Sequence, residues 1–164
     1  MTERLDSVAV QAAQRFGDRL LASERAQGEL TLRVGPDALI EILTWARDEA
    51  SPRFAMLTDI SGVDGLGFDW SPRFRVSYHL LDLEHGTRLR VMADTAETAD
   101  GPSVPTVTGL WELANWNERE VWDLMGIRFA GHPDLRRILM HEDYALGHPL
   151  RKEIPTRGVH DDNR

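Results

Sequence analysis

The sequence predicts an α+β fold of two layers, in which helices pack on one mixed or mostly antiparallel sheet and an extended C-terminal arm follows. Apolar residues recur at helical spacing near the N-terminus, and residues 74–80 alternate between apolar and polar side chains, as a half-buried strand does. After residue 127, three prolines exclude long helices. We therefore divide the chain into an α+β domain, residues 1–126, and a proline-containing arm, residues 127–164.

Composition limits the classes of function. The 164 residues suffice for one domain with an ordinary core, and the absence of cysteine excludes disulfides, a thiol nucleophile and the usual thiolate ligation of iron–sulfur clusters. A net charge of −8 argues against binding to nucleic acid or to an anionic membrane surface. The sequence contains neither a long apolar run nor a signal-peptide pattern, so we expect a soluble cytoplasmic protein.

The N-terminal part begins with a predicted amphipathic helix over about the first 26 residues, because apolar side chains recur there from Leu5 to Leu20. Residues 30–34 alternate as a strand does. Gly35-Pro36-Asp37 then turns the chain into a second helix, which carries its apolar residues at 39, 42, 43 and 46.

The middle of the chain predicts strands at 54–63, at 74–80 and around 89–91, with turns at Asp64-Gly65 and at residues 84–86. Residues 93–105 have no periodicity, and we interpret them as a surface loop. A third helix, capped by Thr106 or Thr108, is expected to reach Met125, where Gly126 ends it in the left-handed conformation.

The arm contains two similar turns, residues 131–137 and 147–152, and each presents basic side chains. With the helix before it, this segment closely resembles the 30-kDa subunit family of respiratory complex I, the NADH-quinone oxidoreductase. The family signature Glu-Arg-Glu-x-x-Asp-x-x-Gly-Ile is matched by residues 118–127, and its continuation Gly-His-Pro-Asp-Leu-Arg-Arg-Ile-Leu by residues 131–139. A departure occurs at residues 152–155, where many members have Lys-Asp-aromatic-Pro and continue further.

The resemblance implies a cofactor-free scaffold and assembly subunit in the hydrophilic arm of a proton-translocating NADH:quinone oxidoreductase, peripheral on the cytoplasmic face of the cell membrane. The subunit would have no active site of its own. It would support electron transfer from NADH to quinone, while FMN, iron–sulfur clusters and quinone are bound by partner subunits. The expected partners are the large quinone-site subunit and adjacent iron–sulfur subunits, so contact with the membrane is indirect.

The interface with those partners is expected on the third helix and the arm. Arginine suits bidentate carboxylate contacts, and tryptophan with arginine is typical of interface hot spots. Within the isolated chain we expect Arg136 and Arg137 to be solvated. The candidate interface residues are Trp116, Glu118, Arg119, Glu120, Asp123, His132, Pro133, Asp134, Arg136, Arg137, His148, Pro149, Arg151 and Lys152.

Three alternatives remain at this point. The first is the equivalent subunit of a ferredoxin-dependent complex or a membrane-bound hydrogenase. The second is a metal-dependent hydrolase that uses His132, His141 and His148, whose spacing fits no helical ligand pair. The third takes Glu118, Glu120 and Asp123 as catalytic carboxylates, although ion pairs with Arg119 and Arg128 are the commoner use of such acids. We therefore expect the chain itself to have no metal, cofactor or catalytic site.

Overall fold

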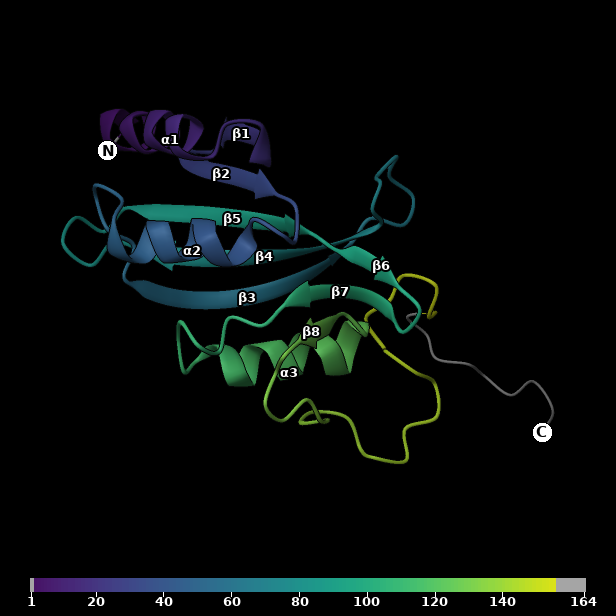
Figure 1. The fold of residues 1–164 in the computed structure, drawn as a ribbon. Coiled ribbons are helices and arrows are strands. Elements are labelled where there is room, and N and C mark those ends of the chain that lie inside the picture. Colours follow the sequence, from purple (N-terminus) through teal and green to yellow (C-terminus); the bar gives the residue numbers. More distant parts are fainter. Residues whose placement is uncertain (1, 156–164) are drawn as a thin grey trace.

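The computed structural model describes residues 2–155, so that part of the predicted arm, residues 156–164, lies outside the described residues. The α+β class is confirmed (Figure 1). Within residues 2–155, the α-helices are α1 (Thr2–Phe16), α2 (Leu39–Asp48) and α3 (Ala114–Met125). The main sheet contains β1 (Leu20–Ala26), β2 (Glu29–Val34), β3 (Met56–Asp64), β4 (Phe74–Leu81) and β5 (Arg88–Asp94).

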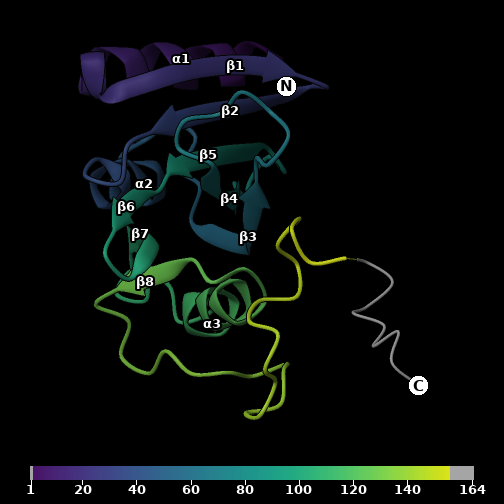
Figure 2. The same ribbon diagram turned by 90° about the vertical axis from the view of Figure 1, so that its right-hand side faces the viewer.

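The main sheet is mixed, as predicted, with the strand order β1-β2-β5-β4-β3. β2 and β5 run parallel, and the other neighbours are antiparallel. α1 packs against β1 and β2 at one end of the sheet, and α3 packs against β3 at the other end (Figures 1 and 2). The predicted apolar faces of β2, β4 and α2 are confirmed as parts of the shared hydrophobic core.

The first helix is shorter than predicted. It ends at Phe16, and a 3-10 turn at Gly17–Arg19 leads into the edge strand β1. The backbone of Gly17 adopts a φ of 51°, which L-residues other than glycine rarely adopt and which ends the helix. Leu20 fits the helical period in the sequence, but β2 offers a free edge, and antiparallel pairing with that edge decides the conformation of residues 20–26.

A second sheet replaces most of the predicted loop at residues 93–105. The predicted arrangement of helices on one sheet is therefore incomplete. β5 extends to Asp94, and the hairpin of β6 (Ala96–Thr98) and β7 (Gly101–Pro105) follows. β7 pairs in parallel with β8 (Arg128–Ala130), which lies more than 20 residues further along the chain. No local pattern in the sequence indicates that pairing.

The third helix begins later than predicted, at Ala114, and neither Thr106 nor Thr108 caps it. The Thr106 hydroxyl instead donates to Glu118. The C-terminal prediction is confirmed, because Gly126 has a φ of 71° and its N–H donates to the carbonyl of Trp122.

The core continues past residue 126, because the side chains of Ile127 and Phe129 are buried and β8 belongs to the second sheet. Beyond β8, residues 131–155 form turns without a described helix or strand. Figure 2 shows residues 131–155, to which we restrict the term arm from here on, passing around α3. That it docks on partner subunits stays a prediction.

Gly126 provides a first test of how the arm is held. A Cβ added there would lie 2.4 Å from the His148 ring and 2.5 Å from the Arg151 guanidinium, and the left-handed φ adds strain. We expect Gly126→Ala to lower the free energy of unfolding by about 1–2 kcal/mol for the backbone and by ~1–3 kcal/mol more for the overlap. The measurement is urea denaturation, with Gly28→Ala as the control, because Gly28 has a φ of 82° and open space around it. Equal losses in the two variants would contradict the close contact.

Candidate functional site

Helix α3 divides the candidate residues between the interior and the surface. Glu118, Arg119 and Asp123 are buried, whereas Trp116 and Glu120 are exposed. Burying ionisable groups costs free energy unless hydrogen bonds or opposite charges compensate them. The groups that form hydrogen bonds with these three side chains therefore show which parts of the chain helix α3 holds in place.

Asp123 holds the first part of the arm. Its Oδ1 accepts from Arg137 Nη1 at 2.7 Å, and its Oδ2 accepts from the backbone N–H groups of Ile138, Leu139 and Met140 at 3.1, 2.9 and 2.9 Å. Burial alone would raise the pKa of Asp123, but these donors outweigh it and hold the pKa below its usual value. The carboxylate thus replaces the backbone acceptors that a sheet would supply.

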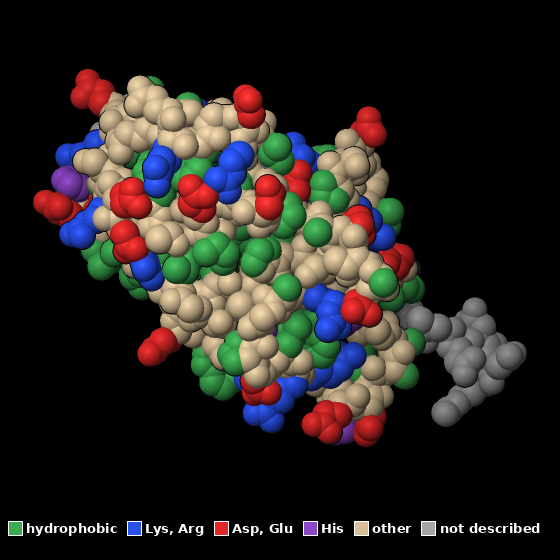
Figure 3. Space-filling model, viewed as in Figure 1, with side chains coloured by type: hydrophobic (Ala, Val, Ile, Leu, Met, Phe, Trp, Pro, Cys, Tyr) green, Lys and Arg blue, Asp and Glu red, His purple; other side chains and the backbone are tan. Residues whose placement is uncertain are grey.

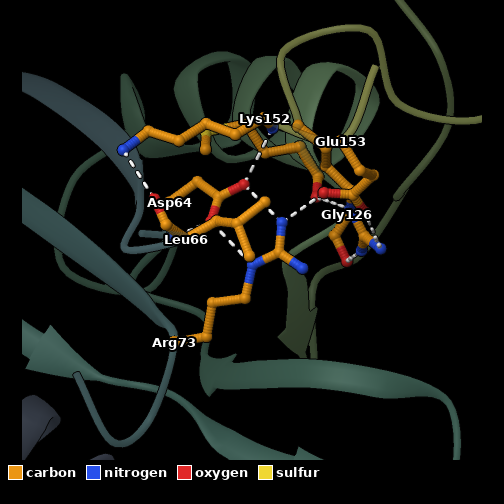
Figure 4. A network of polar contacts seen from close by, with 8 residues as sticks. Asp64, Leu66, Arg73, Gly126, Lys152 and Glu153 are labelled. Atoms are coloured by element: carbon orange, nitrogen blue, oxygen red, sulfur yellow. Dashed lines mark hydrogen bonds and ion pairs between the residues drawn. The ribbon is translucent and has the colours of Figure 1, made fainter. Parts of the chain in front are cut away.

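Asp64 holds the second part of the arm (Figure 4). Arg73 forms a two-point contact with it, Nε to Oδ1 at 2.7 Å and Nη2 to Oδ2 at 2.6 Å, and the backbone N–H of Lys152 donates to Oδ2 at 2.9 Å. Arg73 also pairs with Glu153, and Lys152 Nζ donates to the carbonyl of Leu66 at 3.2 Å. The hydrogen bonds from Arg73 hold the pKa of Asp64 well below its usual range despite burial.

The C-terminus of α3 is closed by two side chains of the arm. His148 Nδ1 lies 2.9 Å from the carbonyl oxygen of Asp123, and Arg151 donates to the carbonyls of Met125 at 2.7 Å and Gly126 at 3.4 Å. The last carbonyls of a helix lack internal donors and carry partial negative charge, so a cation is favourable there. His148 and Arg151 therefore act inside this chain.

Arg119 connects the arm to an exposed tryptophan. It donates to the carbonyls of Arg136 at 3.2 Å and Arg137 at 3.4 Å, and its guanidinium lies 5.1 Å from the ring centroid of Trp116. The Trp116 side chain is nonetheless 59% exposed. Trp111 and Trp122 are partly buried against the core, so Trp116 is the tryptophan of this helical region that best suits an interface.

Among residues 2–155, the carboxylate of Glu118 has no arginine or lysine partner, unlike those of Asp123 and Asp64. Its carboxylate accepts from the Thr106 hydroxyl at 2.5 Å and from the backbone N–H of Val107 at 2.6 Å. Burial raises the pKa of Glu118 to about 7, although both hydrogen bonds act to lower it. The nearest imidazole nitrogen, His132 Nε2, is 4.0 Å away.

The predicted interface residues thus fall into two groups. Within the described chain, the exposed ones are Trp116, Glu120, Pro133, Asp134, Arg136 and Lys152. The buried or half-buried ones are Glu118, Arg119, Asp123, His132, Arg137, His148, Pro149 and Arg151. Arg136 is solvated, as expected. The expectation for Arg137 is wrong, because it pairs with buried Asp123 rather than extending into solvent.

The residues proposed for a metal-dependent hydrolase do not converge. His132 and His148 contact backbone carbonyls, and the side chain of His141 is 82% exposed. Among residues 2–155, no group of three or more histidines, cysteines or carboxylates is arranged to hold a metal ion. A depression of about 620 Å³ lies elsewhere, between α1 and the β4–β5 turn, and exposed Arg4 and Arg53 line it.

Sequence reasoning missed Asp64 and Arg73 as parts of this site. Asp64 carried a turn signal with Gly65, and its arm partner Lys152 follows 88 residues later. Nothing local in the sequence indicates that contact. An acid at the end of a predicted strand, with Arg73 and Arg75 nearby in the sequence, is the one available hint.

Comparison with known proteins identifies relatives of this chain. Residues 32–160 match the family model described as respiratory-chain NADH dehydrogenase, 30 Kd subunit. The chain is 46% identical over 162 residues to an NADH-quinone oxidoreductase subunit of this kind from Rhizobium etli, covering 96% of this chain and 76% of the relative. It is 42% identical over 162 residues to the corresponding NADH-quinone oxidoreductase subunit of Rhodobacter capsulatus, with the same coverage.

Two solved structures share the fold. The trypsin-resistant fragment (1-134) of Nqo5 superposes with a TM-score of 0.66 and 35% identity, covering 80% of this chain and 99% of the fragment. A chain of the membrane-bound sulfane sulfur reductase, an archaeal respiratory membrane complex, gives a TM-score of 0.67 at 22% identity, covering 92% and 85%. The second likeness concerns the fold alone. Among residues 2–155, no helix has the length and apolar character needed to cross a membrane.

The role of Asp123 can be tested by Asp123→Asn, which removes the charge facing Arg137 and leaves one acceptor oxygen. Breaking a buried ion pair costs about 3–5 kcal/mol, and we expect the amides of residues 138–140 to lose protection from hydrogen exchange. Asp134→Asn is the control, because its partner Arg136 is exposed, and a change within about 0.5 kcal/mol is expected. Unchanged protection at residues 138–140 in the Asp123 variant would show that the arm is held by other contacts.

Proposed function

Since the chain belongs to the 30-kDa subunit family of respiratory-chain NADH dehydrogenases, we propose that it is a scaffold and assembly subunit of a proton-translocating NADH:quinone oxidoreductase. In this role the chain holds partner subunits in place. Electrons pass from NADH to quinone through FMN and iron–sulfur clusters of other subunits. The 164-residue sequence has no cysteine and therefore offers no thiolate ligand for a cluster of its own.

The observation that carries this proposal is an arm whose backbone is fixed while its large apolar side chains face outward. Asp123 and Asp64 bind the arm at residues 137–140 and 152. Between and beside these anchors, Leu139 and Leu150 are each 59% exposed and Leu146 is 46% exposed. In the lower part of Figure 3, over α3 and the arm, hydrophobic side chains lie beside basic ones. Exposed apolar groups with polar neighbours are typical of protein interfaces.

Trp116 supports the same proposal from α3. The Arg119 guanidinium lies 5.1 Å from the Trp116 ring centroid and is itself held by two arm carbonyls, so the contact favours one placement of the ring before binding. A large aromatic side chain held in place at the surface has the properties of an interface hot spot. The protein is then peripheral, on the cytoplasmic face of the cell membrane, and reaches the membrane through its partners.

The partners we propose are the large quinone-site subunit, foremost, and adjacent iron–sulfur subunits. The curated relatives at 42–46% identity are named as subunits of NADH-quinone oxidoreductase, which favours an NADH-linked assembly over a ferredoxin-dependent complex or a hydrogenase. The Nqo5 fragment covers 80% of this chain at 35% identity, which supports the family assignment on which the proposed partners rest.

Trp116→Ala tests this assignment. We expect it to weaken the association with the quinone-site subunit at least tenfold, about 1.4 kcal/mol, because an exposed, oriented ring is lost from the interface. Leu139→Ala should act in the same direction. The measurement is the amount of the quinone-site subunit that co-purifies with each tagged variant from native membranes, together with the Tm of each purified chain.

Leu83→Ala is the matched control, because Leu83 is 67% exposed in the β4–β5 turn, away from the arm. All three variants should melt within a few degrees of the unsubstituted chain. Normal recovery of the quinone-site subunit with Trp116→Ala would refute the proposed interface. A complex that assembles normally with both variants but no longer reduces quinone would refute the scaffold role.

A further inference from the structure

In the part of the chain that the structure describes, Glu118 differs from the other two buried carboxylates of this region because it has no positively charged partner. Asp123 pairs with Arg137 and Asp64 pairs with Arg73. The Glu118 side chain is fully buried, and among residues 2–155 its carboxylate forms hydrogen bonds with an uncharged hydroxyl and a backbone N–H. An ionised carboxylate in such surroundings is unfavourable relative to its protonated form.

His132 does not supply the missing charge. Its Nδ1 accepts from the backbone N–H of Asp134 at 3.0 Å, so the ring proton is assigned to Nε2, which lies 3.1 Å from the carbonyl oxygen of Asn115. Both ring nitrogens of the neutral tautomer are thus used. Its side chain is fully buried, and the 4.0 Å between Nε2 and Glu118 exceeds hydrogen-bond distance.

Tyr78 approaches Glu118 from β4. Its hydroxyl oxygen is buried and has no hydrogen-bond partner among the described residues. Burial raises the pKa of Tyr78 well above its usual value, and the negative charge of Glu118 raises it further. The phenol therefore stays neutral. The groups that face Glu118 from β4, from the 106–108 segment and from the start of the arm are thus all uncharged, while Arg119 on α3 is bound to arm carbonyls.

A pair of hydroxyl groups leads from Glu118 toward the surface. Thr106 Oγ1 lies 2.5 Å from the Glu118 carboxylate and 3.0 Å from Thr108 Oγ1. Both threonines are half-buried, and the neighbouring Gly109 is exposed. A hydroxyl can donate one hydrogen bond while accepting another, so this row of oxygens can conduct a proton without opening the fold.

We propose that Glu118 is a proton-binding site of this chain, which exchanges one proton with solvent through the hydroxyls of Thr106 and Thr108. A proton from water forms an O–H bond at Thr108 Oγ1, the Thr108 hydroxyl proton passes to Thr106 Oγ1, and the Thr106 hydroxyl proton passes to Glu118 Oε2. Release to water follows the reverse order. Oε1 keeps the hydrogen bond from Val107 N–H in both states.

The acidity of Glu118 is consistent with this site. Burial raises the pKa from 4.5 to about 7, so the proton is bound below neutral pH and released as the pH rises above it. The folded chain therefore binds this proton more strongly than the unfolded chain. The resulting contribution to stability is complete below pH 4.5 and is lost as the pH rises through about 7.

The proton would bind where the connection between β7 and α3 contacts β8. Residues 106–108 connect β7 to the start of α3, and the N–H of Thr106 donates to the carbonyl of Ala130 at the end of β8. Protonation changes Glu118 Oε2 from an acceptor to a donor toward Thr106. The second sheet, α3 and the beginning of the arm all meet at that contact. The proposed proton-binding site is independent of the proposed scaffold function.

The test is carbon-13 NMR of the full chain labelled at the glutamate carboxyl carbon. We expect one glutamate to titrate with a midpoint near pH 7. Glu118→Gln should abolish that titration, and Glu120→Gln, the matched control on the exposed face of the same helix, should leave it intact. Thr106→Val should move the midpoint to higher pH, because a hydrogen bond that lowers the pKa is lost.

Two results would overturn the proposal. One is that all glutamates titrate in the range of exposed carboxyls, and the other is that the titration near neutral pH persists in Glu118→Gln. Circular dichroism checks that each variant is folded. If Glu118→Gln does not fold, Thr106→Val decides instead, because an unchanged midpoint in that variant shows that the titrating group is not Glu118.

Discussion

The carboxylate of Asp123 is the interaction on which the arm depends. One buried side chain accepts from Arg137 and from three consecutive backbone N–H groups, so it satisfies donors in a segment that has no sheet or helix partner. Burial of this carboxylate is costly, and the arm donors offset that cost. Helix α3 and the arm therefore depend on one another for a stable conformation.

The three buried carboxylates of this region act differently because their counter-ions differ. Asp123 and Asp64 each have an arginine and backbone donors, so they remain ionised and serve as fixed anchors. Glu118 lies on the same helix as Asp123 but has an uncharged environment, so the same chemical group becomes protonatable near neutral pH. The placement of arginine, and not burial alone, separates a structural carboxylate from a titrating one.

Local periodicity predicted the elements whose own residues carry a clear helical or alternating pattern. Alternation identified β4, helical spacing identified α2, and Gly126 was expected to end α3. It failed for β1, because Leu20 continues the helical spacing although residues 20–26 form a hairpin with β2, and for β7, because its partner β8 lies more than 20 residues further along the chain. For the site, motif residues located α3 and the arm, but Asp64 was missed because its contact with Lys152 spans 88 residues. Arg137 was misplaced because its charge alone suggested solvent.

The arm also explains how a segment without regular structure can present an ordered surface. A mobile segment would lose backbone freedom on binding, about 1–2 kcal/mol for each residue fixed, which would weaken any complex. Here Asp123, Asp64 and Arg119 restrict the backbone before a partner arrives, and they do so from its inner side. On the outer side of the arm, Leu139 and Leu150 remain exposed beside Trp116 of α3, and in the proposed interface their burial would contribute directly to affinity. Separating inner polar anchors from outer apolar side chains would let one short segment belong to its own domain and also serve the proposed interface.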